Sequence, residues 1–130
     1  MEAFMTGVAA LSRPVGTAAG RIAAMAALAV SVAFAHGVHD PGVLCPLRAL
    51  TDIPCPFCGG TTVFIELGSG HLLRALAANP LVFVGAMVFA VAPLGLGARW
   101  RTWKPQVRAW ILGTAIVGSG IWQFVRFGIF

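Results

Sequence analysis

Residues 81–98 read L-V-F-V-G-A-M-V-F-A-V-A-P-L-G-L-G-A, a run with no charged side chain and nine Leu, Phe or Val residues. On a membrane-insertion scale those nine residues contribute about −3 to −5 kcal/mol, from which the glycines and Pro93 subtract. A helix needs roughly 20 residues of this kind to cross the hydrocarbon core of a bilayer. We therefore predict a membrane-spanning helix over residues 81–98, with a kink near its end at Pro93.

Two further apolar runs cover residues 22–38 and residues 107–125. The run over residues 22–38 is diluted by alanine and is the weakest candidate for a membrane span. Membrane insertion of residues 107–125 is opposed by Gln123 and by Arg108, and Arg108 can snorkel from the end of that run. The whole chain is 58% hydrophobic and 10% charged, too few charges for the surface of a soluble domain. We predict an all-α integral membrane protein, one domain over residues 1–130 with about three transmembrane helices.

The segment between the first two spans, Thr61–Ala78, is apolar but carries charge. Each charge at mid-membrane costs roughly 2.5 to 3.5 kcal/mol, so Glu66 and Arg74 cancel the apolar gain. Its Val, Phe and Leu residues recur at helical spacing, and Gly68 and Gly70 interrupt the run. We expect two short amphipathic helices that lie at the membrane surface or pack on the bundle.

Local signals mark where these elements begin and end. Asn79-Pro80 suits an N-cap followed by proline at the first helical position, which would start the second span. Lys104-Pro105 can start the third span in the same way. Asp40-Pro41-Gly42 predicts a turn that leaves the first span.

Positive charge predicts the orientation. Cytoplasmic links are rich in Lys and Arg, and six of these residues lie before the first span or near the link between the second and third: Arg13, Arg21, Arg99, Arg101, Lys104 and Arg108. We therefore expect the N-terminus in the cytoplasm and residues 39–80, with all three cysteines, outside. These charges form no basic face, so we expect no nucleic-acid partner. Ala33-Phe34-Ala35 also resembles a signal-peptide cleavage site, which would leave two spans and the same placement of the cysteines.

Cys45, Cys55 and Cys58 lie in one polar stretch, and the spacing C-P-F-C-G admits three interpretations. The first is a zinc site, because two thiolates three residues apart can meet one tetrahedral ion. A closed structural site needs four ligands, and the candidates for the fourth are His36, His39 and His71. We predict no other cofactor.

The second interpretation is a dithiol–disulfide redox pair of Cys55 and Cys58 at the start of a helix, which lowers a thiol pKa. No βαβ pattern builds a thioredoxin-like scaffold around it. The third is a structural disulfide from Cys45 to Cys55 or Cys58 on an oxidising face, worth roughly 3 kcal/mol by the chain-entropy model. We favour the disulfide, which leaves one cysteine over.

The apolar runs carry small residues four apart, which permit close approach of helices, at Ala23/Ala27/Ser31, Ala86/Ala90 and Ala115/Ser119. No catalytic constellation is recognisable, so we do not expect an enzyme. We predict an accessory or interaction subunit of a membrane complex, with the lipid bilayer and other membrane proteins as its partners. The alternative is a thiol-redox or metal-binding membrane protein that acts through C-P-F-C.

The cysteine segment resembles a bacterial membrane family known as domain of unknown function 2752. The resemblance rests on Cys45, Cys55-Pro56-Phe57-Cys58-Gly59-Gly60-Thr61 and Asn79-Pro80-Leu81, and it covers about residues 45–98. Asp52 stands where the family usually has glycine, and Thr62 stands where it usually has arginine. The resemblance implies a bacterial inner-membrane protein and brings no established reaction. If the family's arginine binds an anion or caps the loop, that role is lost or moved here.

Overall fold

The computed structural model describes residues 2–39, 42 and 45–129, with the side chains of 2–12 left aside. Helices connected by short links make up this part of the chain, and it contains no β-strand. In chain order they are α1 (Glu2–Val38), α2 (Pro46–Thr51), α3 (Gly60–Gly68), α4 (Leu72–Ala78), α5 (Pro80–Val91), the 3₁₀ turn η1 (Ala92–Leu94), α6 (Leu96–Thr102) and α7 (Pro105–Arg126). The all-α prediction is confirmed for these residues.

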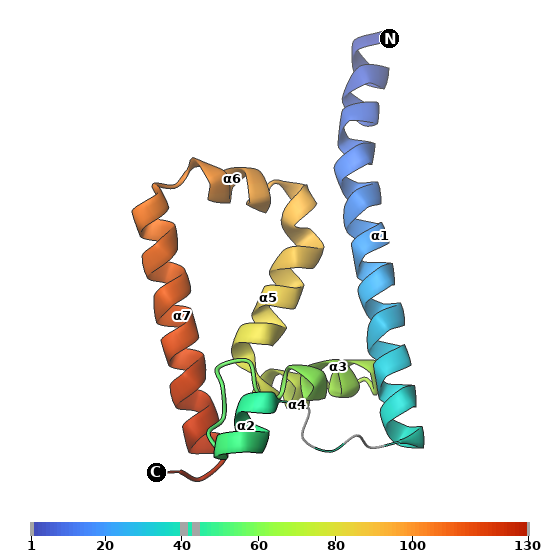
Figure 1. Cartoon of the computed structure of the whole chain (residues 1–130). Helices are drawn as coiled ribbons and strands as arrows, with labels where there is room; N and C mark the ends of the chain where they lie inside the picture. Colours follow the sequence, from blue (N-terminus) through green and yellow to red (C-terminus); the bar gives the residue numbers. More distant parts are fainter. Residues whose placement is uncertain (1, 40–41, 43–44, 130) are drawn as a thin grey trace.

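The helices form a frame with two distinct ends. Figure 1 shows α1, α5 and α7 running between the ends, α6 joining α5 to α7 at one end, and α2, α3 and α4 gathered at the other with the C-terminus. The cysteine segment and the basic α6 link therefore lie at opposite ends of α5. Arg21 of α1 lies at the α6 end, where its guanidinium stacks 4.5 Å from the ring centroid of Phe89 and donates a 3.1 Å hydrogen bond to the Phe89 carbonyl.

The first predicted span lies within a much longer helix, because α1 begins at Glu2 and continues through Pro14. Within α1, residues Arg13–Val38 have a mean hydropathy of 1.8 and are long enough to cross a membrane. By length and composition this is the one such helix among the described residues, unless α4 and residues 80–94 together form a second, bent span. A cleaved signal peptide is also an apolar helix near the N-terminus, so a signal peptide stays the alternative interpretation of residues 22–38.

The second predicted span, residues 81–98, is not one continuous helix. Helix α5 has 12 residues and rises about 18 Å, whereas the hydrocarbon core is about 30 Å thick. The prediction of a kink near Pro93 was too weak: the chain enters a 3₁₀ turn at Ala92 and changes direction at Gly95, whose φ is 114°, to run across to α7 as α6. At its other end α5 meets α4 at an angle of 119°. The second run is therefore a broken element.

The remaining boundaries follow the local signals. The two short helices predicted between residues 61 and 78 are α3 and α4, separated at Ser69–His71. Asn79 caps α5 and Pro80 is its first residue, while Pro105 starts α7, which contains the third predicted span. The predicted turn at Asp40-Pro41 lies outside the described residues.

The surface of the chain is large and apolar. A soluble monomer of this mass exposes roughly 6,500 Å², whereas this chain exposes 9107 Å². Its buried core is small, centred on Val63, Ala75 and Ala78 with Leu67, Val82 and Phe83 packed against it. Leu, Ile, Val and Phe side chains along α1, α5 and α7 are exposed instead. This distribution favours an apolar solvent or partner around those three helices.

One close crossing fixes α3 on α1. A Cβ atom at Gly68 would collide with the carbonyl oxygen of Ala29 and would lie 2.9 Å from the Cβ of Ala33. Glycine is therefore required here by the close approach of two helices. The contact attaches the cysteine-bearing end of the chain to the long N-terminal helix.

Candidate thiol and metal centre

Cys45, Cys55 and Cys58 meet in space, although the first two lie ten positions apart in the sequence. The Cys55 sulfur lies 3.5 Å from that of Cys45 and 3.4 Å from that of Cys58. All three sulfur atoms lie within 4.8 Å of one another, and all three cysteines are free thiols. The spacing is too long for the disulfide that we favoured, because a disulfide bond measures about 2.05 Å. The structure therefore does not support that expectation.

Helix α2 positions Cys45. Cys45 is its N-cap residue and Pro46 is its first residue. Proline suits the first position because it has no backbone N–H that would lack a hydrogen-bond partner there. The N–H groups of the first turn, foremost that of Arg48, lower the pKa of the Cys45 thiol to about 7, although none makes a full capping hydrogen bond. A helix start thus favours the thiolate of Cys45.

A tight turn positions the other two thiols. The Cys58 N–H donates to the Cys55 carbonyl at 2.9 Å, and the Cys55 N–H donates to the Cys58 sulfur at 3.1 Å. Gly59 follows with a φ of 82°, which glycine adopts without strain. Cys58 is buried, and its burial raises the pKa of its thiol to about 12. The cluster therefore combines an easily ionised thiol with one that holds its proton.

Asn79 connects this turn to the helices beneath it. The Asn79 side chain is fully buried and donates to the carbonyl oxygens of Pro56, at 2.9 Å, and of Cys58, at 3.0 Å. Its Oδ1 accepts from the N–H of Val82 as the N-cap of α5. From α7 the Ser119 hydroxyl donates to the Pro56 carbonyl at 2.6 Å. Asn79 at the start of α5 and Ser119 of α7 therefore hold the C-P-F-C turn in place.

The α7 side chains also complete the end of α4. Gln123 and Arg126 both donate to the Ala78 carbonyl, at 3.0 and 2.6 Å, and the Trp122 ring N–H donates to Ala77. These bonds satisfy carbonyls that a helix C-terminus leaves without partners. We did not predict this role of α7 from the sequence. Polar residues at positions 119, 123 and 126 share one helix face within an apolar run, a spacing that could have identified them.

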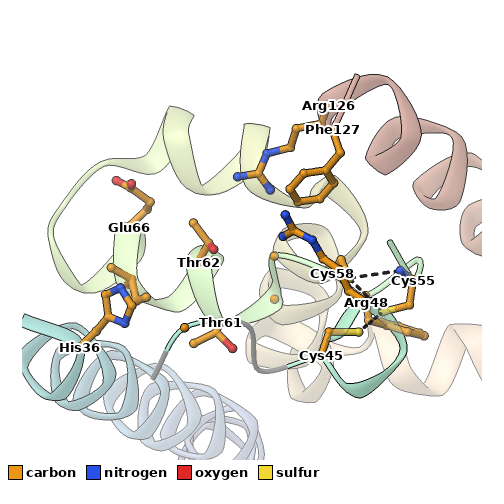
Figure 2. Close-up of a pocket in the computed structure, with 15 residues that line it drawn as sticks. His36, Cys45, Arg48, Cys55, Cys58, Thr61, Thr62, Glu66, Arg126 and Phe127 are labelled. Carbon is orange, nitrogen blue, oxygen red and sulfur yellow. Dashed lines mark hydrogen bonds between the residues drawn. The ribbon is translucent and has the colours of Figure 1, made fainter. Parts of the chain in front are cut away.

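The thiols open onto a cavity of about 610 Å³. Figure 2 shows its wall, with the cysteines on one side and Arg48, Arg126 and Phe127 beside them. Both guanidinium groups lie against the Phe127 ring. The Cζ atom is 4.0 Å from the ring centroid for Arg48 and 5.4 Å for Arg126. The cavity therefore joins a soft, sulfur-lined wall to a cationic one.

The predicted fourth ligands do not join the sulfurs. No histidine or carboxylate of the described residues belongs to the three-sulfur cluster. His36 lines the cavity at a distance from the thiols in Figure 2, and His71 instead contacts Glu66 at 3.2 Å. His39 is exposed and does not line the cavity.

Some motif residues hold the C-P-F-C turn in place, and others line the cavity. Pro56 accepts hydrogen bonds from Asn79 and Ser119, whereas Gly59, Thr61 and Thr62 line the cavity. Thr62 shares that cavity with Arg48 and Arg126, which bring two guanidinium groups to it from α2 and α7. Asp52 ends α2 with a φ of 56°, a conformation that glycine adopts most easily. This conformation explains why glycine suits the position that Asp52 occupies.

Comparison with known proteins agrees with the resemblance of the cysteine segment. Residues 45–92 match a family described as protein of unknown function (DUF2752). The DUF2752 match includes the three cysteines and the whole of helices α2, α3, α4 and α5. No curated protein and no solved structure matches the chain.

Proposed function

We propose that this chain is a membrane protein that binds a soft metal ion, Zn²⁺ or Cu⁺, through the thiolates of Cys45, Cys55 and Cys58. The triangle of three free sulfur atoms at the wall of an open cavity carries the proposal. Soft thiolate ligands select such ions over Mg²⁺ or Ca²⁺. The arrangement supports this function better than the disulfide or the accessory role.

The distances favour a metal over a disulfide. Three thiolates at about 2.3 Å from a tetrahedral ion lie roughly 3.8 Å from one another. The observed separations of 3.5 and 3.4 Å need to change by only a few tenths of an ångström to reach that value. A disulfide requires one pair to approach to about 2.05 Å, a much larger movement.

The site leaves a coordination position for a ligand from outside. Three protein ligands and one open position distinguish exchanging or reactive metal sites from closed structural ones. The cavity beside the sulfurs gives a ligand room to reach the ion. We therefore propose that the chain acquires and passes on metal, a role that a closed four-cysteine site would not suit.

We place the site at the extracytoplasmic face of a bacterial inner membrane. In this topology α1 and α7 cross the bilayer, and α4 and α5 form a broken third element. The cationic residues of α6 and the α6–α7 link lie at the end opposite the cysteines, as the positive-inside rule requires for a cytoplasmic link. Helix α7 rises about 33 Å, enough to cross.

The alternative function is thiol redox chemistry between Cys55 and Cys58. The 3.4 Å separation of their sulfurs favours it. Closing that disulfide removes two protons and two electrons, and a partner oxidant would have to accept the electrons. The accessory role in a membrane complex stays a prediction that rests on the small-residue helix faces.

Elemental analysis and thiol counting separate these functions. We expect the chain, purified without oxygen in mild detergent, to hold about one Zn or Cu per molecule and to lose it in Cys45→Ser, Cys55→Ser and Cys58→Ser. His36→Ala is the matched control, because His36 lines the cavity away from the sulfurs, and it should keep the metal. A metal-free wild type with one disulfide per chain would overturn the proposal and support redox chemistry.

A further inference from the structure

A second feature of the cavity is its concentration of positive charge. Arg48 from α2 and Arg126 from the end of α7 both line it, and both lie against the Phe127 ring. Their guanidinium carbons can be no farther apart than the sum of their two distances to that ring. Like charges within that range repel each other, and an anion that binds both lowers this repulsion.

Glu66 lines the same cavity, but no carboxylate of the described residues forms an ion pair with either arginine. The ion pair among these residues is His71 with Glu66, and neither arginine belongs to it. Arg126 donates to the Ala78 carbonyl, and Arg48 contacts the face of Phe127. Each guanidinium has five N–H donors, so both retain donors for a further acceptor.

The start of α3 adds to the same charge. Arg126 Nη1 lies 2.7 Å from where a Cβ of Gly59 would be, so a guanidinium sits over the N-cap of α3. A helix N-terminus carries partial positive charge and disfavours a nearby cation. Gly59 permits this approach because it has no side chain. Two guanidinium ions and a helix N-terminus in one cavity favour an anion as its ligand.

In Figure 2 the guanidinium ends of Arg48 and Arg126 point toward the middle of the cavity, away from the sulfur atoms. The two arginines and the three thiols therefore line different parts of its wall.

We propose that Arg48 and Arg126 bind a phosphate group in this cavity, beside the three thiols. Guanidinium groups pair with phosphate in a bidentate way, and a tetrahedral phosphate has enough oxygens to accept from both arginines at once. Thr61 and Thr62 line the same cavity and offer hydroxyl donors. Phosphate binding here does not depend on metal binding, because it uses none of the sulfurs.

The phosphate can belong to a lipid headgroup or to a small soluble anion, and two probes separate these sources. One is inorganic phosphate, titrated calorimetrically into the metal-free chain in an uncharged detergent. The other is phosphatidylglycerol, whose retention is measured by native mass spectrometry. Binding of inorganic phosphate supports a soluble ligand, and retention of the lipid alone supports a headgroup.

Three arginine variants test the assignment. Arg48→Gln and Arg126→Gln should each weaken binding of the bound probe about tenfold or more, because each removes a charge-assisted contact. Arg74→Gln is the matched control, since Arg74 lies on α4 and does not line the cavity. It should bind as the wild type does.

Folding and metal binding have separate controls. Arg126→Gln also loses a hydrogen bond to Ala78, so its melting temperature must be measured, whereas Arg48→Gln loses only a stacking contact. A Cys55→Ser/Cys58→Ser variant should still bind phosphate, even if no metal site exists. Equal binding by Arg48→Gln and Arg74→Gln, or no binding of either probe to the wild type, would overturn the inference.

Discussion

The buried amide of Asn79 donates a 3.0 Å hydrogen bond to the carbonyl oxygen of Cys58. This bond joins the N-cap of α5 to the last cysteine of the C-P-F-C turn. The same side chain caps α5 through its oxygen. Asn79 therefore has two separable roles, one as an acceptor for the helix and one as a donor for the thiol site.

Substitution of Asn79 separates the two roles. Asn79→Asp keeps the capping oxygen but removes the donor to Pro56 and Cys58, and it places a carboxylate against two carbonyl oxygens. We expect both Asn79→Asp and Asn79→Ala to destabilise the fold by about 2–4 kcal/mol, from lost buried hydrogen bonds. Thermal unfolding in detergent measures this. A wild-type melting temperature for Asn79→Asp would show that capping alone matters.

Cys45 and Cys58 should differ in reactivity. Cys45 ionises at about pH 7, so its alkylation rate should rise with pH through 7 and level off above it. Cys58, with a pKa of about 12 and a buried sulfur, should resist iodoacetamide until the chain is denatured. Peptide mass mapping at several pH values measures the order. Equal modification of Cys45 and Cys58 at pH 7.5 would contradict the described geometry.

Metal affinity should depend strongly on pH. Metal binding must displace the Cys58 proton, whose pKa of about 12 lies well above the working range. Affinity should therefore increase about tenfold or more for each pH unit between 7 and 9, and more steeply below 7, where Cys45 also holds its proton. Competition with a chromophoric chelator of known pH dependence measures this, and a flat profile would argue against thiolate ligands.

Gly68 should be essential for the attachment of α3 to α1. Gly68→Ala brings a methyl group against the Ala29 carbonyl, and we expect a loss of about 1–3 kcal/mol, as for other overpacked contacts. Gly85→Ala is the control, because a Cβ atom at Gly85 would have nothing within 4 Å and alanine suits a helix. Equal melting temperatures for the two variants would contradict the close crossing.

The sequence predicted the elements whose signals are local. Asn79-Pro80 marked the start of α5, and Gly68 and Gly70 marked the break between α3 and α4, because caps and glycines act within a few residues. Helix α2 was missed, since its six residues are too few to show a periodic pattern. The break after α5 was underestimated, because Pro93 predicts a kink, whereas the left-handed Gly95 turns the chain into α6.

The candidate site was only partly predictable. The sequence predicted that Cys45 lies near Cys55 or Cys58, and their sulfur atoms do lie close together. It predicted a disulfide rather than three free thiols, because the exact position of Cys45 depends on helix α2. The contribution of α7 is a tertiary effect over more than forty residues. Ser119, Gln123 and Arg126 share a helix face, and only their contacts show that this face holds the thiol turn.

X-ray absorption spectroscopy of the metal-loaded chain tests the central claim most directly. Loaded with Zn²⁺ or Cu⁺ and kept reduced, the wild type should show three sulfur neighbours at about 2.3 Å, with any additional neighbour in the Zn²⁺ form an oxygen or nitrogen. A first shell made only of oxygen or nitrogen atoms would contradict the three-cysteine metal site.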